Sequence, residues 1–203
     1  MNGHSAFCAD IGSIPGKKFG WSKLAGGTLQ TGTRMENLAI EIAKAITNVD
    51  YVSIGFECPL FVPVRENPES VASARSGEGN RSWSAGAGTG ALATGMVEIL
   101  WIMNRVRSLL GYAPKPVFDW REFLESKSVF LWEAFVTAKA KGHSDRHDAE
   151  IALRKFLDST GDIKVANAIT EEKVLSLIGA CALRAEWTRD VSILWKPCLV
   201  IKA

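Results

Sequence analysis

The sequence lacks a large excess of charge of either sign. Among its 203 residues, 24 Lys and Arg stand against 22 Asp and Glu, so the formal net charge is +2. This balance alone gives no electrostatic reason to expect a polyanionic partner or a membrane surface. Hydrophobic residues make up 47% and charged residues 23% of the chain, which excludes a disordered, collagen-like or coiled-coil protein. The length predicts a single domain over residues 1–203.

Closely spaced cysteines are lacking as well. Cys8, Cys58, Cys181 and Cys198 lie far apart, and no two of them form a C-x-x-C pair. This spacing is not typical of a structural metal site or a disulfide framework, and it predicts four reduced, mostly buried thiols. The first residues do not resemble a secretory signal. We therefore expect a cytoplasmic protein.

Long uncharged apolar runs are also absent. The most apolar long stretch, residues 90–111, contains Glu98, Asn104, Arg105 and Arg107. A membrane-spanning helix needs about 20 nearly uncharged residues. This stretch is therefore predicted to be a core helix, and no membrane partner is expected.

Short apolar runs separated by glycine-rich turns are present near the start of the chain. Residues 5–11, 19–24 and 28–33 predict an antiparallel meander of three strands. Thr33 and Glu36 have the spacing of a capping box that would open a helix to about residue 48. Further along, the pattern predicts strands at 51–57, 128–135 and 198–201, and helices at 92–110, 145–157 and from Thr170 onward. This order predicts an α/β domain with a mixed central sheet.

A polar loop rich in Gly and Ser occupies about residues 63–89 and contains Arg75 and Arg81. Such a long loop in a compact domain is usually functional or mobile. The two arginines are either solvated charges or substrate-binding residues, because guanidinium matches phosphate geometry. The glycine-rich run 86–90 lacks the sequence context of a nucleotide-binding loop. The helix that follows can still offer its N-terminus to a phosphate.

Four carboxylates stand where chemistry is expected. Asp10 and Glu57 each close a predicted buried strand, and an acid there is unfavourable unless it is solvated, capped or bound to a cation. Asp10 can also be interpreted as a turn residue. This interpretation is weaker for Glu57, because glutamate is a poor turn former. Asp145 and Asp148 lie three residues apart on one face at a helix start, where acids are also common for electrostatic reasons.

The four acids can form a single site. Strand ends can lie side by side, and a helix that crosses the same edge can add further carboxylates. Carboxylate oxygens and water are the ligands that Mg²⁺ or Mn²⁺ prefers. Two such ions about 4 Å apart can activate a water and stabilise the leaving oxygen of a phosphodiester. Glu133, in the apolar strand 128–135, is a second-tier candidate for substrate binding, and Trp83 could stack on a base.

Short motifs along the chain resemble the RNase H-like (retroviral integrase) superfamily. They are Asp10-Ile-Gly12, Phe19-Gly-Trp21, Gly55-Phe-Glu57 and Asp145-x-x-Asp148-Ala. The last of these resembles the acidic helix of RuvC-type junction resolvases. A larger part of the chain resembles a family of predicted RNase H-fold nucleases of unknown role, through Phe130-Leu-Trp-Glu133, Ser176-Leu-Ile-Gly-Ala180 and the final Leu-Val-Ile.

The resemblance implies a three-layer fold with a mixed five-stranded sheet, helices on both faces and additional C-terminal helices and a strand. It also implies that Asp10, Glu57, Asp145 and Asp148 bind two Mg²⁺ or Mn²⁺ ions, and that the partner is DNA or RNA. One departure concerns the acid of the fourth strand. In the nearest family it is often an aspartate in an Asp-x-Pro context, whereas here it is Glu57 before Cys58-Pro59.

Two other functions stay open. A small phosphotransferase related to the actin-like ATPases would also use an Asp-x-Gly turn, although this chain has no room for the usual second domain. A binding protein with a vestigial site is the third alternative. The preferred interpretation is a metal-dependent nuclease.

Overall fold

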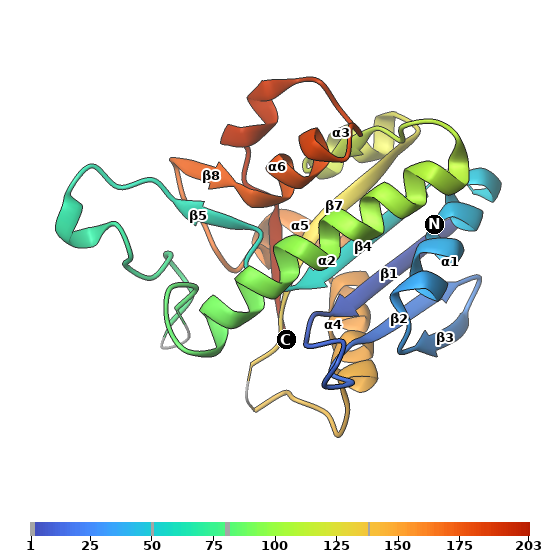
Figure 1. Cartoon of the computed structure of the whole chain (residues 1–203), viewed down its shortest axis with the longest axis horizontal. Helices are drawn as coiled ribbons and strands as arrows, with labels where there is room; N and C mark the ends of the chain where they lie inside the picture. Colours follow the sequence, from blue (N-terminus) through green and yellow to red (C-terminus); the bar gives the residue numbers. More distant parts are fainter. Residues whose placement is uncertain (1–2, 50, 80–81, 138) are drawn as a thin grey trace.

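The computed structural model describes residues 3–49, 51–79, 82–137 and 139–203. Within these residues, a seven-stranded mixed sheet forms the centre of the molecule (Figure 1). Its main path runs β3-β2-β1-β4-β7-β6, and β9 also pairs with β7. The strands are β1 (His4–Asp10), β2 (Gly20–Ala25), β3 (Thr28–Gly32), β4 (Tyr51–Glu57), β6 (Pro116–Val117), β7 (Ser128–Phe135) and β9 (Leu199–Lys202).

The first three strands form an antiparallel meander, and the remaining pairs are parallel. β2 pairs antiparallel with β1 and β3, whereas β4 is parallel to β1, and β7 is parallel to β4. This is the strand order of the RNase H-like fold, and it confirms the predicted fold class. The predicted C-terminal strand joins the sheet as β9, while the two-residue β6 was not predicted.

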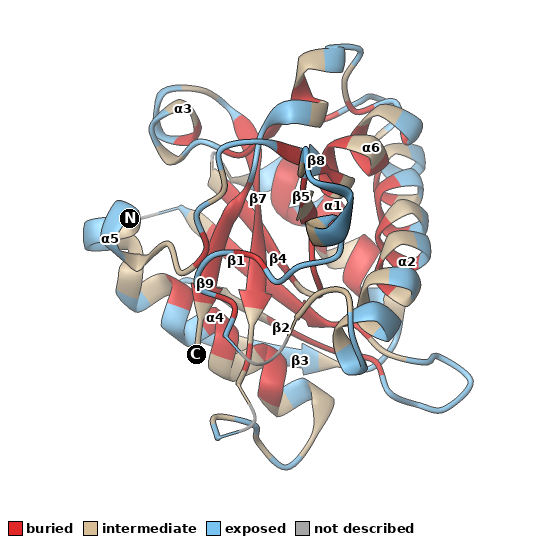
Figure 2. Ribbon diagram, turned by 90° about the vertical axis from the view of Figure 1, so that its left-hand side faces the viewer, coloured by how far each residue is buried: buried red, intermediate tan, exposed pale blue. Residues whose placement is uncertain are grey.

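Helices cover both faces of the sheet and make three layers. On one side lie α1 (Met35–Asn48), α2 (Ala87–Leu110) and α6 (Leu177–Arg184), and on the other α3 (Trp120–Glu125) and α4 (Asp145–Ser159). Figure 1 shows α2 in front of the sheet and α4 behind it. Successive strand residues point to opposite faces, so Phe7 and Ala9 join the first core while Ala6 and Cys8 join the second. Figure 2 shows β1, β4 and β7 buried between these layers.

Short elements complete the chain within the described residues. A two-stranded antiparallel ribbon is made of β5 (Phe61–Pro63) and β8 (Val174–Ser176). The remaining short helices are η1 (Pro68–Ser70), η2 (Thr160–Asp162), α5 (Ile163–Ala166) and η3 (Val191–Trp195). The long predicted loop is therefore interrupted by η1, follows directly on β5 and ends where α2 begins.

Three predicted helix starts differ from the structure. α2 begins at Ala87 and not at residue 92, so residues 87–89 of the predicted loop belong to this helix. The helix expected from Thr170 begins only at Leu177, because residues 174–176 pair with β5 as a strand. Ser176 then caps α6, since its Oγ accepts the N–H of Gly179 at 3.2 Å. The capping box at Thr33 also does not form: α1 begins after Arg34, and no side chain caps it. Before α6, pairing with a distant part of the chain outweighs the local signal.

The four cysteines are buried and unpaired, as predicted. The longest helix of the described chain, α2, is 24 residues long and contains buried Glu98. Neither α2 nor any other described helix has an apolar stretch that would cross a bilayer.

Candidate metal centre

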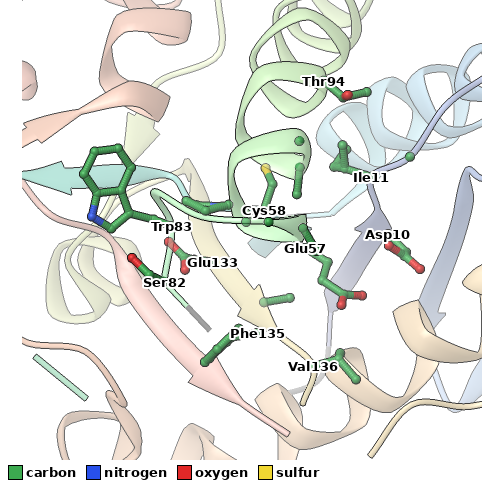
Figure 3. Close-up of a pocket in the computed structure, with 18 of the residues that line it drawn as sticks. Asp10, Ile11, Glu57, Cys58, Ser82, Trp83, Thr94, Glu133, Phe135 and Val136 are labelled. Carbon is green, nitrogen blue, oxygen red and sulfur yellow. The ribbon is translucent and has the colours of Figure 1, made fainter. Parts of the chain in front are cut away.

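Asp10 and Glu57 are neighbours at one edge of the sheet. Each is the last residue of its strand, β1 or β4, and the parallel register pairs one directly with the other. The carboxyl ends of neighbouring parallel strands are where α/β folds usually place their ligands. Figure 3 shows the two side chains near each other at these strand ends. The sequence prediction that the two acids lie together is thus confirmed.

Asp148 completes a cluster of three. One carboxylate oxygen of Asp148 and one each of Asp10 and Glu57 all lie within 4.8 Å of one another. Among the described residues this is the one such group of acids, histidines or cysteines. Three carboxylates at this spacing offer the oxygen-rich environment of a hard divalent cation.

The first turn of α4 brings Asp148 to the cluster because it packs directly against β2. A Cβ at Gly20 of β2 would lie 2.3 Å from the backbone nitrogen of Arg146, so only glycine allows this approach. Ser22 Oγ also donates a hydrogen bond to the carbonyl of Arg146 at 3.0 Å. These contacts place the Asp148 side chain at the edge where β1 ends.

Lys141 brings the positive charge of the site. Its Nζ lies 3.4 Å from Oδ2 of Asp148 and 4.0 Å from Oε1 of Glu57. The neighbouring Gly142 donates its backbone N–H to Oδ1 of Asp148 at 2.5 Å. Sequence analysis missed Lys141. The available signal was a lysine in the short segment that joins the end of a buried strand to the acidic helix start.

Burial makes the first two carboxylates hard to ionise. It raises the pKa of Asp10 to about 7, with the charges of Asp145 and Asp148 acting in the same direction. Burial and the charge of Asp10 raise the pKa of Glu57 to about 9. Lys141 opposes both shifts. If all three carboxylates were ionised, their negative charge would exceed what this single ammonium balances, so without a further cation Asp10 and Glu57 keep their protons to higher pH.

Oε2 of Glu57 is an independent sign of a missing partner. It is buried, and no described residue forms a hydrogen bond with it. A buried carboxylate oxygen without a donor is strongly unfavourable. A bound cation would satisfy it, so the residues present fit a divalent metal ion.

Asp145, the fourth predicted ligand, is not brought into the group of three. It is the first residue of α4 and half-buried. Its charge reaches Asp10, whose pKa it helps to raise.

Sequence analysis also missed Glu98. This residue of α2 is buried, burial raises its pKa to about 7, and the charge of Asp10 adds to the shift. Its Oε2 has no hydrogen-bond partner among the described residues either. An acid inside an apolar helix was the available signal, and we used it only against a membrane span.

A cavity of about 620 Å³ opens from the acidic cluster. Asp10, Glu57 and Lys141 line one part of it, and the residues around the start of α2 line another. The residue before that helix, Gly86, provides no side-chain cap, and the N–H of Gly88 in the first turn donates to the carbonyl of Ala85 at 3.1 Å. The positive end of the helix dipole still favours an anion at this place. Trp83 also lines the cavity (Figure 3).

Arg75 lies beside this cavity, but its guanidinium is turned into the protein. Nε donates to Glu78, Nη1 to Glu133 and the carbonyl of Phe61, and Nη2 to Glu78 and Glu133. Arg75 and Glu133 thus bind each other in the structure. Both were predicted to bind substrate. Arg81, the other predicted phosphate ligand, lies outside the described residues.

Comparisons with models of known protein families, with curated proteins and with solved structures return no match to this chain. The likeness to the RNase H-like superfamily therefore stands on two observations. These are the strand order of the sheet and the group of three carboxylates at its edge.

Proposed function

We propose that this protein is a divalent-metal-dependent nuclease that hydrolyses phosphodiester bonds in DNA or RNA. The observation that carries the proposal is the group of Asp10, Glu57 and Asp148 within 4.8 Å, at the edge of a sheet with RNase H-like strand order. Mg²⁺ or Mn²⁺, bound as two ions, would supply the activated water and the stabilisation of the leaving oxygen.

The residues of the chain divide the work between holding metal and holding phosphate. Asp10, Glu57 and Asp148 would hold the first ion, and Asp145 is available beside Asp10 as a ligand for the second. Lys141 carries a positive charge into the same cavity, where it would contact a substrate phosphate. Because the chain as a whole is nearly neutral, we expect weak affinity for nucleic acid without metal and appreciable affinity with it.

The start of α2 supports a phosphate-bearing substrate. Its uncapped first turn lines the same cavity as the carboxylates, and a helix N-terminus favours anions through its dipole. A phosphate at this end would neighbour the one bound at the metal centre. Adjacent phosphates are what a nucleic acid strand presents.

The test is cleavage of single-stranded, duplex and branched DNA and RNA in the presence of Mg²⁺ or Mn²⁺. We expect metal-dependent cleavage that falls by about 100-fold or more in Asp10→Asn, since the variant loses a ligand of the ion that activates water. Asp158→Asn removes the same charge from an exposed position of α4 and should retain activity. No cleavage of any substrate above the Asp10→Asn background would refute the nuclease.

A small-molecule phosphotransferase is the second candidate, and the size of the cavity favours it. About 620 Å³ is a usual volume for a small-ligand site. This candidate predicts that ATP with Mg²⁺ raises the melting temperature while oligonucleotides do not, because a ligand stabilises the folded state that binds it. The nuclease predicts that oligonucleotides with metal raise the melting temperature more.

A further inference from the structure

Arg75, Glu78 and Glu133 form a buried ionic cluster next to the candidate metal centre. The side chains of all three are 1% exposed. The guanidinium of Arg75 lies 2.6 Å from Oε1 of Glu133 and 3.0 Å from Oε1 of Glu78. Glu78 also accepts the backbone N–H of Arg75 and of Trp83, each at 2.9 Å. Every N–H group of the guanidinium donates to an acceptor of the protein. Arg75 therefore has a structural role and no donor left for a substrate.

The cluster also holds the backbone that follows Glu57. Oε2 of Glu133 accepts the N–H of Leu60 at 2.9 Å. Nη1 of Arg75 donates to the carbonyl of Phe61 at 3.2 Å, and the guanidinium lies 4.8 Å from the centre of the Phe61 ring. Leu60 and Phe61 are the third and fourth residues after Glu57. The turn after β4 is therefore held at two successive residues.

The strand register explains why Glu133 can reach this turn. β7 is the parallel neighbour of β4, and Glu133 pairs with Phe56. Glu133 therefore lies on β7 beside the residue that precedes Glu57 at the end of β4. The Glu133 carboxylate is next to the turn of Leu60. It also binds Arg75, which belongs to the loop that follows β5.

We propose that Arg75 and Glu133 are positioning residues for Glu57. They fix the turn of residues 58–61, and the fixed turn sets where the Glu57 carboxylate lies relative to Asp10 and Asp148. Glu78 holds the Arg75 guanidinium in the orientation that this requires. The inference rests on the proposed function in one respect, namely that Glu57 is a metal ligand.

A simpler role would be to anchor the loop of residues 64–86, and the chain contains a matched control for it. Arg65 and Glu171 tie the same loop elsewhere: Nη1 and Nη2 of Arg65 lie 2.7 and 2.8 Å from the Glu171 carboxylate, which also accepts the N–H of Ser76 at 2.8 Å. Glu171 forms none of the hydrogen bonds that hold Leu60 and Phe61. Its removal loosens the loop but leaves the turn after Glu57 in place.

The experiment compares Glu133→Ala, Glu133→Gln and Glu171→Ala in the 203-residue chain. Mn²⁺ affinity is measured by titration calorimetry, and the exchange of the Leu60 amide hydrogen is measured without metal. Partners that orient a metal ligand change metal affinity by about 10- to 100-fold when removed. We expect a loss of this size, with faster Leu60 exchange, in Glu133→Ala.

The two other variants should change less than Glu133→Ala. In Glu133→Gln, the amide oxygen still accepts the Leu60 N–H, but the amide NH₂ replaces the oxygen that accepts from Nη2 of Arg75. Leu60 exchange should therefore stay near the wild type, and the loss of Mn²⁺ affinity should be smaller than in Glu133→Ala. Glu171→Ala should leave both readouts unchanged. If Glu133→Ala fails to fold, Arg75→Lys replaces it. This variant keeps the charge but loses the forked contacts of the guanidinium, and it should weaken Mn²⁺ binding in the same direction.

Two results would overturn the proposal. One is unchanged Mn²⁺ affinity in a folded Glu133→Ala or Arg75→Lys variant of a wild type that binds Mn²⁺. The other is an equal loss in Glu171→Ala, which would assign the effect to loop anchoring. A wild type that binds no Mn²⁺ overturns the proposed function instead. Leu60 exchange then still decides whether Glu133 holds the turn after Glu57.

Discussion

Two groups of charged residues lie at the same cavity, which Asp10, Glu57, Arg75, Glu78 and Glu133 line, and they differ in how their charges are balanced. In the acidic cluster, three carboxylates share one partly exposed ammonium, and one oxygen of Glu57 has no hydrogen-bond partner among the described residues. In the cluster of Arg75, Glu78 and Glu133, the guanidinium lies between two carboxylates and every contact is short. Burial raises the pKa of Glu133 too, but Arg75 and the Leu60 N–H oppose that shift.

The difference teaches where to look for function in a buried polar network. A group that is fully hydrogen-bonded within the protein makes the fold specific and rigid. A buried group with unused hydrogen-bonding capacity needs a further partner, and perturbed carboxylates in a cavity are typical of functional sites. The acidic cluster is therefore expected to bind a cation, while the cluster of Arg75, Glu78 and Glu133 supports it.

The largest expected effect is on stability, in the balanced cluster. Arg75→Met leaves two buried carboxylates without their partner, and we expect a loss of about 3–5 kcal/mol in the free energy of unfolding. Arg105→Met is the matched control, because Arg105 pairs with Glu36 at a half-exposed site, and it should lose less than about 1 kcal/mol. Urea unfolding measures both. Equal losses would show that the buried cluster is not special.

A second prediction concerns pH and the acidic cluster. The folded-state pKa values of Asp10 and Glu57 lie above their ordinary values, so the folded protein keeps protons that the unfolded chain has released. Metal-free stability should therefore fall as the pH rises from about 4, through about 7 for Asp10 and towards about 9 for Glu57. The rise in melting temperature on adding Mg²⁺ should be larger at about pH 8.5 than at about pH 6, because protons then no longer compete for the ligands.

Asp10→Asn is the control for this pH dependence. The variant has no charge at this position to desolvate, so its metal-free stability should fall less steeply with pH than that of the wild type. A wild type whose metal-free stability rises between about pH 6 and pH 8.5 would contradict the assigned shifts.

The smallest effect is expected at Lys141. Its side chain is 45% exposed, so Lys141→Met should lower metal-free stability by less than about 1 kcal/mol. The stabilisation by Mg²⁺ should increase, because the ion then replaces the missing positive charge. Lys139→Met, at an exposed position of the same segment, should change neither quantity. Thermal melts with and without Mg²⁺ measure the difference, and equal behaviour of the two variants would argue against a role for Lys141 in the cluster.

Sequence analysis performed best where the signal was local. Short apolar runs between turn residues predicted β1, β2, β3, β4 and β7, and an acid at the end of a buried strand marked Asp10 and Glu57. It performed worst where partners come from far along the chain. The stretch of residues 174–176 lies just before a helix, yet it pairs with β5 as a strand, and no local pattern shows that an edge is there to pair with.

Side-chain partners of the loop were equally hidden from the sequence. Arg75 is 58 residues away from Glu133, its partner in the fold. A loop arginine without a known partner fits a phosphate as well as a carboxylate, because the guanidinium binds both in the same geometry. The chemistry of the residue alone therefore did not distinguish a substrate ligand from a structural one.

The sequence by itself determined where the main strands lie along the chain and that Asp10 and Glu57 end two of them, because apolar runs and turn residues are local signals. The tertiary structure decided which charges meet. It brought Asp148 and Lys141 to the two strand ends, left Asp145 outside the group of three and gave Arg75 to Glu133. The near-zero net charge is a sum over the chain, whereas the energy of a buried charge depends on what lies within a few ångströms of it.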